Sequence, residues 1–376
     1  MSAPVYLDHA ATTPLCAEAR AAMLDWLGPP ANPHSAHRHG RAAHAAVEAA
    51  RAHVAALIGA QPGDVAFTSG ATEANNWALV GALTKPGQHL RRIVTVATEH
   101  SAVLEPCRHL AALGAELVVL GVDADGLVRL DEAAAAITPG TALVSVMLVN
   151  NETGVIQPVA SIAAMARAAG ALMHCDAAQA AGKLPIDVGA LGIDLMSLSA
   201  HKLYGPAGIG ALWQAPGVRL APLLHGGGQE PGRSGTVPVA LAAGFGAAAR
   251  AAAAAMADDA ARIAALAERL RAQLPPHRLN GAGAPRWSGI LSMTFDVPDG
   301  ARLLADVTRR ISLSSGAACA SAKGRDSHVL AAMGLAPRAA RATLRAGLGR
   351  GTTQADVDAA AAAISDAVTA QLRAAA

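Results

Sequence analysis

Two apolar segments of this chain end in side chains that could carry out covalent chemistry. Residues 192–198 lead into Lys202, and residues 170–173 lead into Asp176. Because the carboxyl ends of parallel strands meet at one edge of an open α/β sheet, we expect these two side chains to lie close together. An electron-sink cofactor such as pyridoxal phosphate needs a lysine for a Schiff base and an acid facing its ring nitrogen. The pair therefore predicts a site of this kind.

Lys202 alone would not support that prediction, because a lysine after a strand is more often an ordinary surface residue. The chain, however, has only four lysines among its 30 lysines and arginines. A lysine at a strand end in so arginine-rich a sequence indicates a chemical need for an amine.

The composition is that of a globular protein with a large core. With 376 residues, 52% of them hydrophobic, the chain can form one large or two medium domains. The net charge is +2 and 2% of the residues are aromatic, so neither charge nor base stacking argues for nucleic acid, and charge gives no case for a membrane. Alanine-rich runs such as residues 247–257 consist of helix formers and predict helices.

The cysteines and the N-terminus indicate a cytoplasmic protein with reduced thiols. The four cysteines are far apart and lack paired spacing, which favours neither a disulfide framework nor a zinc site. Four histidines between residues 34 and 44 have scattered spacing and no cysteine nearby, so we expect no metal site. The first residues do not resemble a signal peptide, and no uncharged apolar run is long enough to span a membrane.

Short apolar segments alternate with helical ones over the first two thirds of the chain. We expect strands at residues 65–68, 92–96, 116–120, 142–148, 171–173, 194–198 and 209–213. Alternation of this kind predicts an α/β fold with a mainly parallel seven-stranded sheet covered on both faces.

The pattern changes after about residue 241 to long helices with few strands. We therefore expect a large domain over residues 15–245. A smaller α+β domain would combine residues 1–14 with residues 246–376.

Several motifs occur in order along nearly the whole chain, and together they identify a family. They are residues 6–14 (YLDHAATTP), 67–73 (FTSGATE), 98–100 (TEH), 149–154 (VNNETG), 197–206 (SLSAHKLYGP), 314–319 (SSGAAC) and 344–350 (LRAGLGR). In these motifs the chain resembles the cysteine desulfurases, which are pyridoxal-phosphate enzymes of aminotransferase class V and fold type I. The segment around Cys319 resembles the group with the longer catalytic-cysteine loop.

The resemblance implies a set of cofactor-binding residues. Residues 69–72 form a tight turn into a helix, so backbone N–H groups and the helix dipole would face the phosphate of pyridoxal 5'-phosphate. The implied cofactor-binding residues are Ala71, Thr72, His100, Asp176, Gln179, Ser199, His201, Lys202 and Thr236. An ordinary N-cap role for Thr72 is compatible with phosphate binding.

Roles around the cofactor ring are also implied by the resemblance. Asp176 would keep the ring nitrogen protonated, and Gln179 would donate a hydrogen bond to the phenolic oxygen. His100 would lie over the ring and shuttle protons. From the residues alone, each of the three could equally be structural, as a lone histidine usually is.

The resemblance further implies how the substrate is held and attacked. Asn151 and Arg345 would bind the substrate carboxylate, Arg345 as a planar bidentate clamp. Cys319 would take the sulfur of L-cysteine as a persulfide and leave L-alanine, with Lys202 and His100 as the other catalytic residues. Cys319 lies in a stretch rich in Ser, Gly and Ala that predicts a mobile loop, whereas we expect Cys16, Cys107 and Cys175 to be small buried residues.

Partners follow from the same resemblance. Thr236 would reach the phosphate of a partner subunit, which implies a homodimer with shared sites, although the segment has one residue fewer before Arg233 than is usual in the family. The sulfur acceptor would be an iron–sulfur scaffold or a tRNA thiolation protein. The alternatives are a selenocysteine lyase, another class V aminotransferase that does not need Cys319, and a non-catalytic scaffold of the same fold.

Overall fold

The computed structural model describes residues 5–30, 32–85, 87–88, 91–315 and 326–375. Its central feature is a seven-stranded sheet with the strand order β2-β8-β7-β6-β5-β3-β4. The strands are β2 (Val65–Thr68), β3 (Arg92–Val96), β4 (Glu116–Leu120), β5 (Thr141–Ser145), β6 (Leu172–Asp176), β7 (Leu195–Ser199) and β8 (Gly210–Gln214). β8 runs antiparallel to both neighbours and all other pairs are parallel, so the expected mainly parallel sheet is confirmed.

One strand is shorter than expected. β5 ends at Ser145, whereas we expected the strand to continue to residue 148. The backbone nevertheless follows β6 beyond that point, because the amides of Val146 and Leu148 donate to the carbonyls of His174 and Asp176 at 3.1 and 2.9 Å. Regular strand pairing ends at this point, but the two segments remain side by side beyond it.

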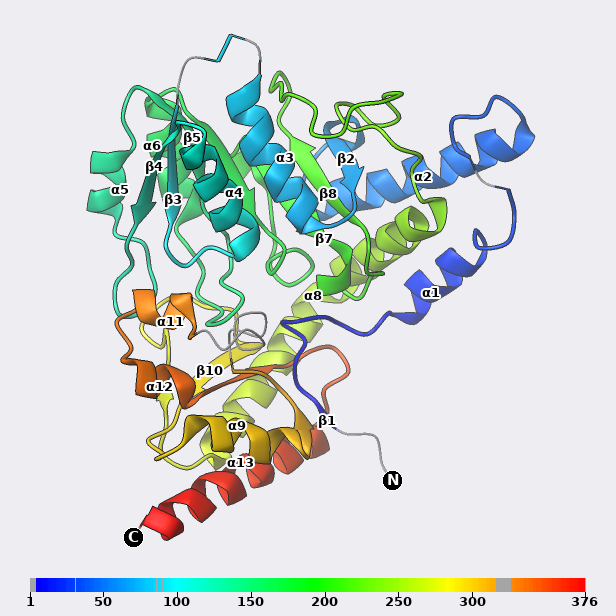
Figure 1. Ribbon diagram of the computed structural model, residues 1–376. Helices are drawn as coiled ribbons and strands as arrows, with labels where there is room; N and C mark the ends of the chain where they lie inside the picture. Colours follow the sequence, from blue (N-terminus) through cyan, green and yellow to red (C-terminus); the bar gives the residue numbers. More distant parts are fainter. Residues whose placement is uncertain (1–4, 31, 86, 89–90, 316–325, 376) are drawn as a thin grey trace.

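Helices cover both faces of this sheet, as continuous apolar strands require. Side chains alternate between the faces: Ile93 packs with Trp77 on one side, and Val94 joins the cluster that contains Ile162 on the other. Figure 1 shows α3 and α4 in front of the sheet and α6 behind it. The helices of this part are α1 (Ala17–Leu24), α2 (Arg38–Leu57), α3 (Ala71–Thr84), α4 (Ser101–Ala112), α5 (Leu130–Ala136), α6 (Val159–Ala168) and α7 (Val188–Leu191), with the 3-10 helices η1 (Pro62–Asp64) and η2 (Ala200–Lys202).

The C-terminal part forms two small sheets of its own. β10 pairs antiparallel with β9 and β12, and the N-terminal strand β1 pairs in parallel with β11. The first residues of the chain thus lie against its C-terminal part. The elements are β1 (Val5–Tyr6), β9 (Arg278–Leu279), β10 (Ile290–Thr294), β11 (Ile311–Ser312), β12 (Thr343–Gly347), α9 (Gly300–Thr308), α11 (His328–Ala332), α12 (Pro337–Arg341) and α13 (Gln354–Ala375).

The long helix α8 (Val239–Gln273) connects the two parts. It crosses residue 245 without a break, and the division into domains at that residue stays a prediction. By length and composition, α8 is the one helix within the described ranges that could cross a membrane. Half of its apolar window is buried, and α1, α2 and α13 pack against it, which is the environment of a core helix.

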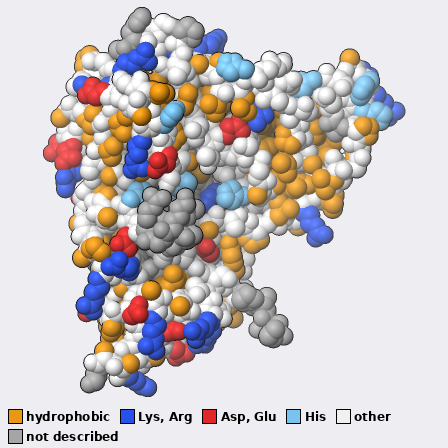
Figure 2. Space-filling view, viewed as in Figure 1, with side chains coloured by type: hydrophobic (Ala, Val, Ile, Leu, Met, Phe, Trp, Pro, Cys, Tyr) orange, Lys and Arg blue, Asp and Glu red, His pale blue; other side chains and the backbone are white. Residues whose placement is uncertain are grey.

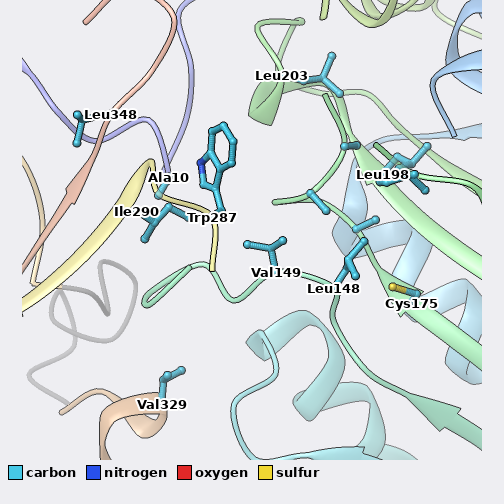
Figure 3. Packing of buried hydrophobic residues seen from close by; sticks show 14 of the residues in the cluster. Ala10, Leu148, Val149, Cys175, Leu198, Leu203, Trp287, Ile290, Val329 and Leu348 are labelled. Carbon is cyan, nitrogen blue, oxygen red and sulfur yellow. The ribbon is translucent and has the colours of Figure 1, made fainter. Parts of the chain in front are cut away.

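The core is continuous from the strand ends of the large sheet to the C-terminal part. Leu148, Cys175 and Leu198 belong to the same buried cluster as Trp287 and Ile290. Figure 3 shows Val149 between these two groups. The segments that meet at the strand ends are therefore fixed by packing on both sides.

Candidate active site

A cavity of about 460 Å³ opens at the carboxyl ends of the parallel strands. Its lining includes ten of the residues expected at the site, namely Ala71, Thr72, His100, Asn151, Asp176, Gln179, Ser199, His201, Lys202 and Arg345. The exposed Thr236 is not part of this lining. Cys319 lies outside the described residues.

The strand ends deliver two of these groups directly. β6 ends at Asp176, β7 ends at Ser199, and η2 carries the chain on to Lys202. The neighbouring β8 begins with Gly210, where a Cβ atom would lie 2.6 Å from the carbonyl carbon of Gly70. A glycine at this position lets the turn before α3 pack against the strand beside the cavity.

Lys202 is held against the N-terminal segment of the chain. Its Nζ donates to the carbonyl oxygens of Ala10 and Ala11, both at 2.7 Å. The side chain is half-buried and lines the cavity. These contacts keep the amine at the cavity wall.

Asp176 is a buried carboxylate fixed by two donors. Its Oδ2 accepts from Nδ2 of Asn75 at 2.7 Å, and its Oδ1 accepts from the backbone amide of Ala178 at 2.9 Å. The residue is 6% exposed. An acid held in this way keeps a fixed orientation towards the cavity.

His100 is the N-cap of α4, where its Nδ1 accepts from the amide of Ala102 at 3.1 Å. Burial in the surrounding protein lowers its pKa, an effect opposed by the charge of Asp176 and reinforced by Lys202. At neutral pH the ring is therefore uncharged. Since Nδ1 is the acceptor, the proton resides on Nε2.

Gln179 lies between Lys183 and the N-terminal segment. Its Nε2 donates to the carbonyl of Ala10, and its Oε1 accepts from Nζ of Lys183, both at 2.7 Å. Burial, followed by repulsion from Lys202, lowers the pKa of Lys183 to about 7. Since Nζ of Lys183 is the donor in this bond, the oxygen of the Gln179 amide faces Lys183.

One end of the cavity is suited to an anion. The first turn of α3 carries no side-chain cap, so its backbone N–H groups are available next to Thr72. Ser199 and His201 line the same cavity. Burial, with repulsion from Lys202 and Lys183, lowers the pKa of His201 to about 4. A neutral His201 can serve as a hydrogen-bond donor there, with Thr12 Oγ1 at 3.0 Å from its Nδ1.

At the other end, Arg345 of β12 enters from the C-terminal part. Its side chain is 3% exposed, and its guanidinium donates to the carbonyl of Asn151 at 3.0 Å and to Oδ1 of Asp8 at 2.8 Å. Arg345 and Asn151 are thus brought together, as the sequence predicted. Asp8 is a third member that the sequence did not reveal.

The described residues on either side of the segment that contains Cys319 contact the wall of this cavity. The amide of Arg345 donates to the carbonyl of Ser314 at 2.6 Å. After the segment, Ser327 Oγ donates to Oε2 of Glu152 at 2.5 Å. Both flanks of residues 316–325 therefore contact residues that line the cavity.

Two of the other cysteines are buried, as expected. Cys107 and Cys175 are 0% exposed. Burial raises the pKa of Cys107 to about 12 and raises that of Cys175 well above the ordinary value. Neither thiol would ionise at neutral pH. Cys16 is half-buried at the start of α1, outside the cavity, and burial raises its pKa as well.

Comparison with known proteins assigns the family. Residues 5–360 match the profile of the family described as class-V aminotransferase. The "Cysteine desulfurase IscS" of Tolumonas auensis is 46% identical over 98% of this chain and 93% of its own length. The chain belongs to the cysteine desulfurases of this family. The "Cysteine desulfurase, mitochondrial" of Arthroderma benhamiae is likewise 46% identical, over 97% of this chain and 75% of its own.

Solved structures agree with this family. A structure titled "NifS-like protein" superposes with a TM-score of 0.90 at 33% identity, covering 98% of this chain and all of its own. Cysteine desulfurases of class V depend on pyridoxal phosphate. The expected fold type is confirmed.

The residues of the cavity fit this cofactor. The uncapped turn of α3 offers amide donors for a phosphate, and Lys202 supplies the amine. The oriented carboxylate of Asp176 can face a protonated ring nitrogen. The close approach of Gly210 to Gly70 shapes the phosphate end.

Sequence reasoning missed several residues of this desulfurase site. The cavity lining also contains Asn75, Glu152 and His328, and Lys183 contacts Gln179 behind it. Asn75 lies inside an apolar helix, where a fully buried amide is a signal that could have been noticed. Glu152 lies in the motif at residues 149–154 but was assigned no role, and His328 gave no signal, because the meeting of the two depends on packing between distant segments.

Proposed function

We propose that this desulfurase converts L-cysteine to L-alanine and transfers the sulfur to Cys319 as a persulfide. The observation that carries the proposal is the meeting of Lys202, Asp176 and Arg345 at one cavity, although Arg345 is far from the other two in the sequence. When bound, pyridoxal phosphate supplies an aldehyde for the amine of Lys202 and a ring that accepts electrons from the substrate.

The chain's own residues divide the remaining tasks. The amides near Ala71, with Thr72, Ser199 and His201, would bind the phosphate, and Asp176 would keep the ring nitrogen protonated. Gln179 would donate to the phenolic oxygen.

Substrate-directed tasks involve a second group of residues. Arg345 and Asn151 bind the substrate carboxylate. Lys202 would remove the proton from Cα of the substrate, and His100 holds on Nε2 a proton that it could return to the substrate as L-alanine forms. The thiolate of Cys319 takes the sulfur.

We also propose a homodimer with shared sites. Figure 2 shows apolar side chains gathered over the region of α1 and α2. Leu15, Leu24 and Leu27 are 40%, 58% and 65% exposed in a single chain. A second copy covering this surface would remove them from water. The exposed Thr236 would then reach the phosphate in the partner subunit.

The sulfur acceptor, location and domain division remain part of the proposal. Persulfide sulfur would pass to an iron–sulfur scaffold or a tRNA thiolation protein. A cytoplasmic location agrees with the sequence, although the name of the Arthroderma relative places that protein in mitochondria. A small domain of residues 1–14 and 246–376 would carry Cys319.

The proposal is tested with the purified protein, loaded with pyridoxal phosphate and given L-cysteine. We expect the visible band of the bound cofactor to shift and alanine and sulfide to form in equal amounts when a thiol reductant is present. Cys319→Ala should retain the cofactor band but lose alanine and sulfide. Cys16→Ala is the matched control, since Cys16 lies outside the cavity.

Other outcomes would select the alternatives. Full turnover of Cys319→Ala would favour another class V aminotransferase reaction. Exclusive activity with selenocysteine would favour a selenocysteine lyase. Failure to bind pyridoxal phosphate at all would favour a non-catalytic scaffold.

A further inference from the structure

Two histidines from different parts of the chain line the same cavity. His100 precedes α4 of the large sheet, and His328 is the first residue of α11 in the C-terminal part. Figure 1 shows α11 next to the loops that follow the large sheet. The role of His328 is not accounted for by the tasks assigned above.

The hydrogen bonds of the two rings leave opposite nitrogens for a ligand. Nε2 of His328 lies 2.8 Å from the carbonyl oxygen of Glu99. A carbonyl can only accept, so Nε2 carries a proton and the neutral ring keeps a lone pair on Nδ1. Nδ1 of His328 has no hydrogen-bond partner among the described residues. His100 is the reverse case, since its Nδ1 accepts from Ala102 and its Nε2 carries the proton.

The position of the His328 ring is fixed from both sides. The preceding Ser327 donates to Glu152 at 2.5 Å and accepts from the amide of Leu330 at 3.1 Å. Together with the Glu99 contact, these bonds hold the start of α11 against the cavity wall. The ring is therefore held in one orientation before a ligand binds, with Nδ1 as the nitrogen not used in the bond to Glu99.

Two ionisable side chains of the cavity, His100 and Glu152, interact electrostatically with His328. Burial lowers the pKa of the His100 ring and raises the pKa of the Glu152 carboxyl. The charge of Arg345 lowers the pKa of Glu152, and the charge of Asp176 raises the pKa of His100. His100 stays neutral at pH 7 because burial lowers its pKa, so it adds no positive charge that would oppose protonation of His328.

We propose that His328 is the base that accepts the thiol proton of the substrate while His100 is the donor on the other side of the same cavity. The thiolate of Cys319 forms the S–S bond while the C–S bond of the substrate breaks and leaves its electron pair on carbon. The S–H proton moves to Nδ1 of His328, and the electron pair of the S–H bond stays on the outer sulfur of the persulfide. This inference rests on the proposed desulfurase activity, because it concerns the thiol of L-cysteine.

The discriminating variant is His328→Gln in the holoenzyme. A glutamine amide can still donate to the carbonyl of Glu99, but it has no nitrogen that takes up a proton. We expect alanine formation from L-cysteine to fall about 100-fold, the effect typical of losing a general base.

A substrate without a thiol separates chemistry from structure. Exchange of the Cα proton of L-alanine with deuterium from D₂O, followed by NMR, uses Lys202 but not the proposed base. This exchange and the affinity for pyridoxal phosphate should be unchanged in His328→Gln. His328→Leu removes both nitrogens and should lose cysteine turnover at least as strongly.

Three results would overturn the inference. The first is an equal loss of L-alanine exchange and cysteine turnover in His328→Gln, which would make His328 structural. The second is wild-type cysteine turnover in that variant, and the third is a Gln variant that works while the Leu variant fails. If the wild-type protein itself forms no alanine from L-cysteine, the proposed function fails instead.

Discussion

The two ends of the cavity are built in different ways. The end that we propose for the cofactor, called the cofactor half, consists of the first turn of α3 with Asp176, Ser199, His201 and Lys202, all from the large sheet and its connections. The end that we propose for the substrate, called the substrate half, consists of Arg345, His328 and Asn151, of which the first two come from the C-terminal part. The cofactor half is fixed by neighbouring strands of one sheet, whereas the substrate half depends on contacts between distant parts of the chain. Changes in the first should therefore affect stability or cofactor binding, and changes in the second should affect the binding or the reaction of the substrate.

The largest expected effect tests the rigidity of the cofactor half through His174. This fully buried residue on β6 lies 2.8 Å from Ser145 Oγ and 2.9 Å from Ser197 Oγ, and burial lowers its pKa to about 4. The unfolded chain therefore binds more protons than the native one between pH 6.5 and about 4. The free energy of unfolding should fall as the pH drops through that window, by up to about 3 kcal/mol.

Urea unfolding above pH 6.5 and near pH 4 measures this effect. His174→Asn should reduce the pH dependence, and the exposed His39→Asn should leave it unchanged. If the free energy of unfolding of the wild-type protein depended on pH as weakly as that of His174→Asn, the prediction that His174 is neutral in the folded protein would be contradicted.

The next effect tests the substrate half through Arg345. In Arg345→Lys the planar guanidinium that contacts Asn151 and Asp8 is lost, and with it a charge-assisted hydrogen bond to a substrate carboxylate. We expect KM for L-cysteine to rise roughly 10- to 100-fold. The affinity for pyridoxal phosphate, measured by the visible band, should stay the same.

Arg350→Lys is the matched control, because Arg350 pairs with Asp259 outside the cavity. A parallel loss of cofactor binding in Arg345→Lys would mean that the two halves are not independent.

The smallest effect concerns Lys183, which donates to Oε1 of Gln179, while Nε2 of Gln179 donates to the carbonyl of Ala10. Lys183→Met removes the donor that fixes the Gln179 amide. Because one hydrogen bond is affected, cofactor affinity should weaken about 3- to 10-fold. Titration of the apo protein with pyridoxal phosphate measures this change, with Lys85→Met, at the end of α3, as control. Unaltered affinity would show that the contact with Ala10 alone orients Gln179.

The cofactor half was largely predictable because its signals are local. A short apolar strand followed by a polar group, as at Asp176 and Lys202, places the group at the edge of the sheet whatever the rest of the chain does. The strand at residues 142–148 was predicted too long, since regular pairing ends at Ser145. Asn75 was missed because its role depends on a hydrogen bond to Asp176, and this bond exists only after the helix has packed over Asp176.

The substrate half was predictable only where a family motif names the residue. Arg345 and Asn151 were expected for that reason, and the structure brings them within hydrogen-bonding distance. Asp8 belongs to a motif but was not assigned, because its partner lies 337 positions away.

The sequence by itself determined the sheet, the lysine–acid pair and the family, since apolar periodicity and short motifs depend on neighbouring residues. The tautomers of His100 and His328 depend on the folded structure, because a backbone group determines which ring nitrogen carries the proton: the amide of Ala102 for His100 and the carbonyl of the distant Glu99 for His328. The same holds for Lys183, whose lowered pKa comes from burial and from the approach of Lys202. Hydrogen bonds and desolvation between distant residues exist only after the chain has folded.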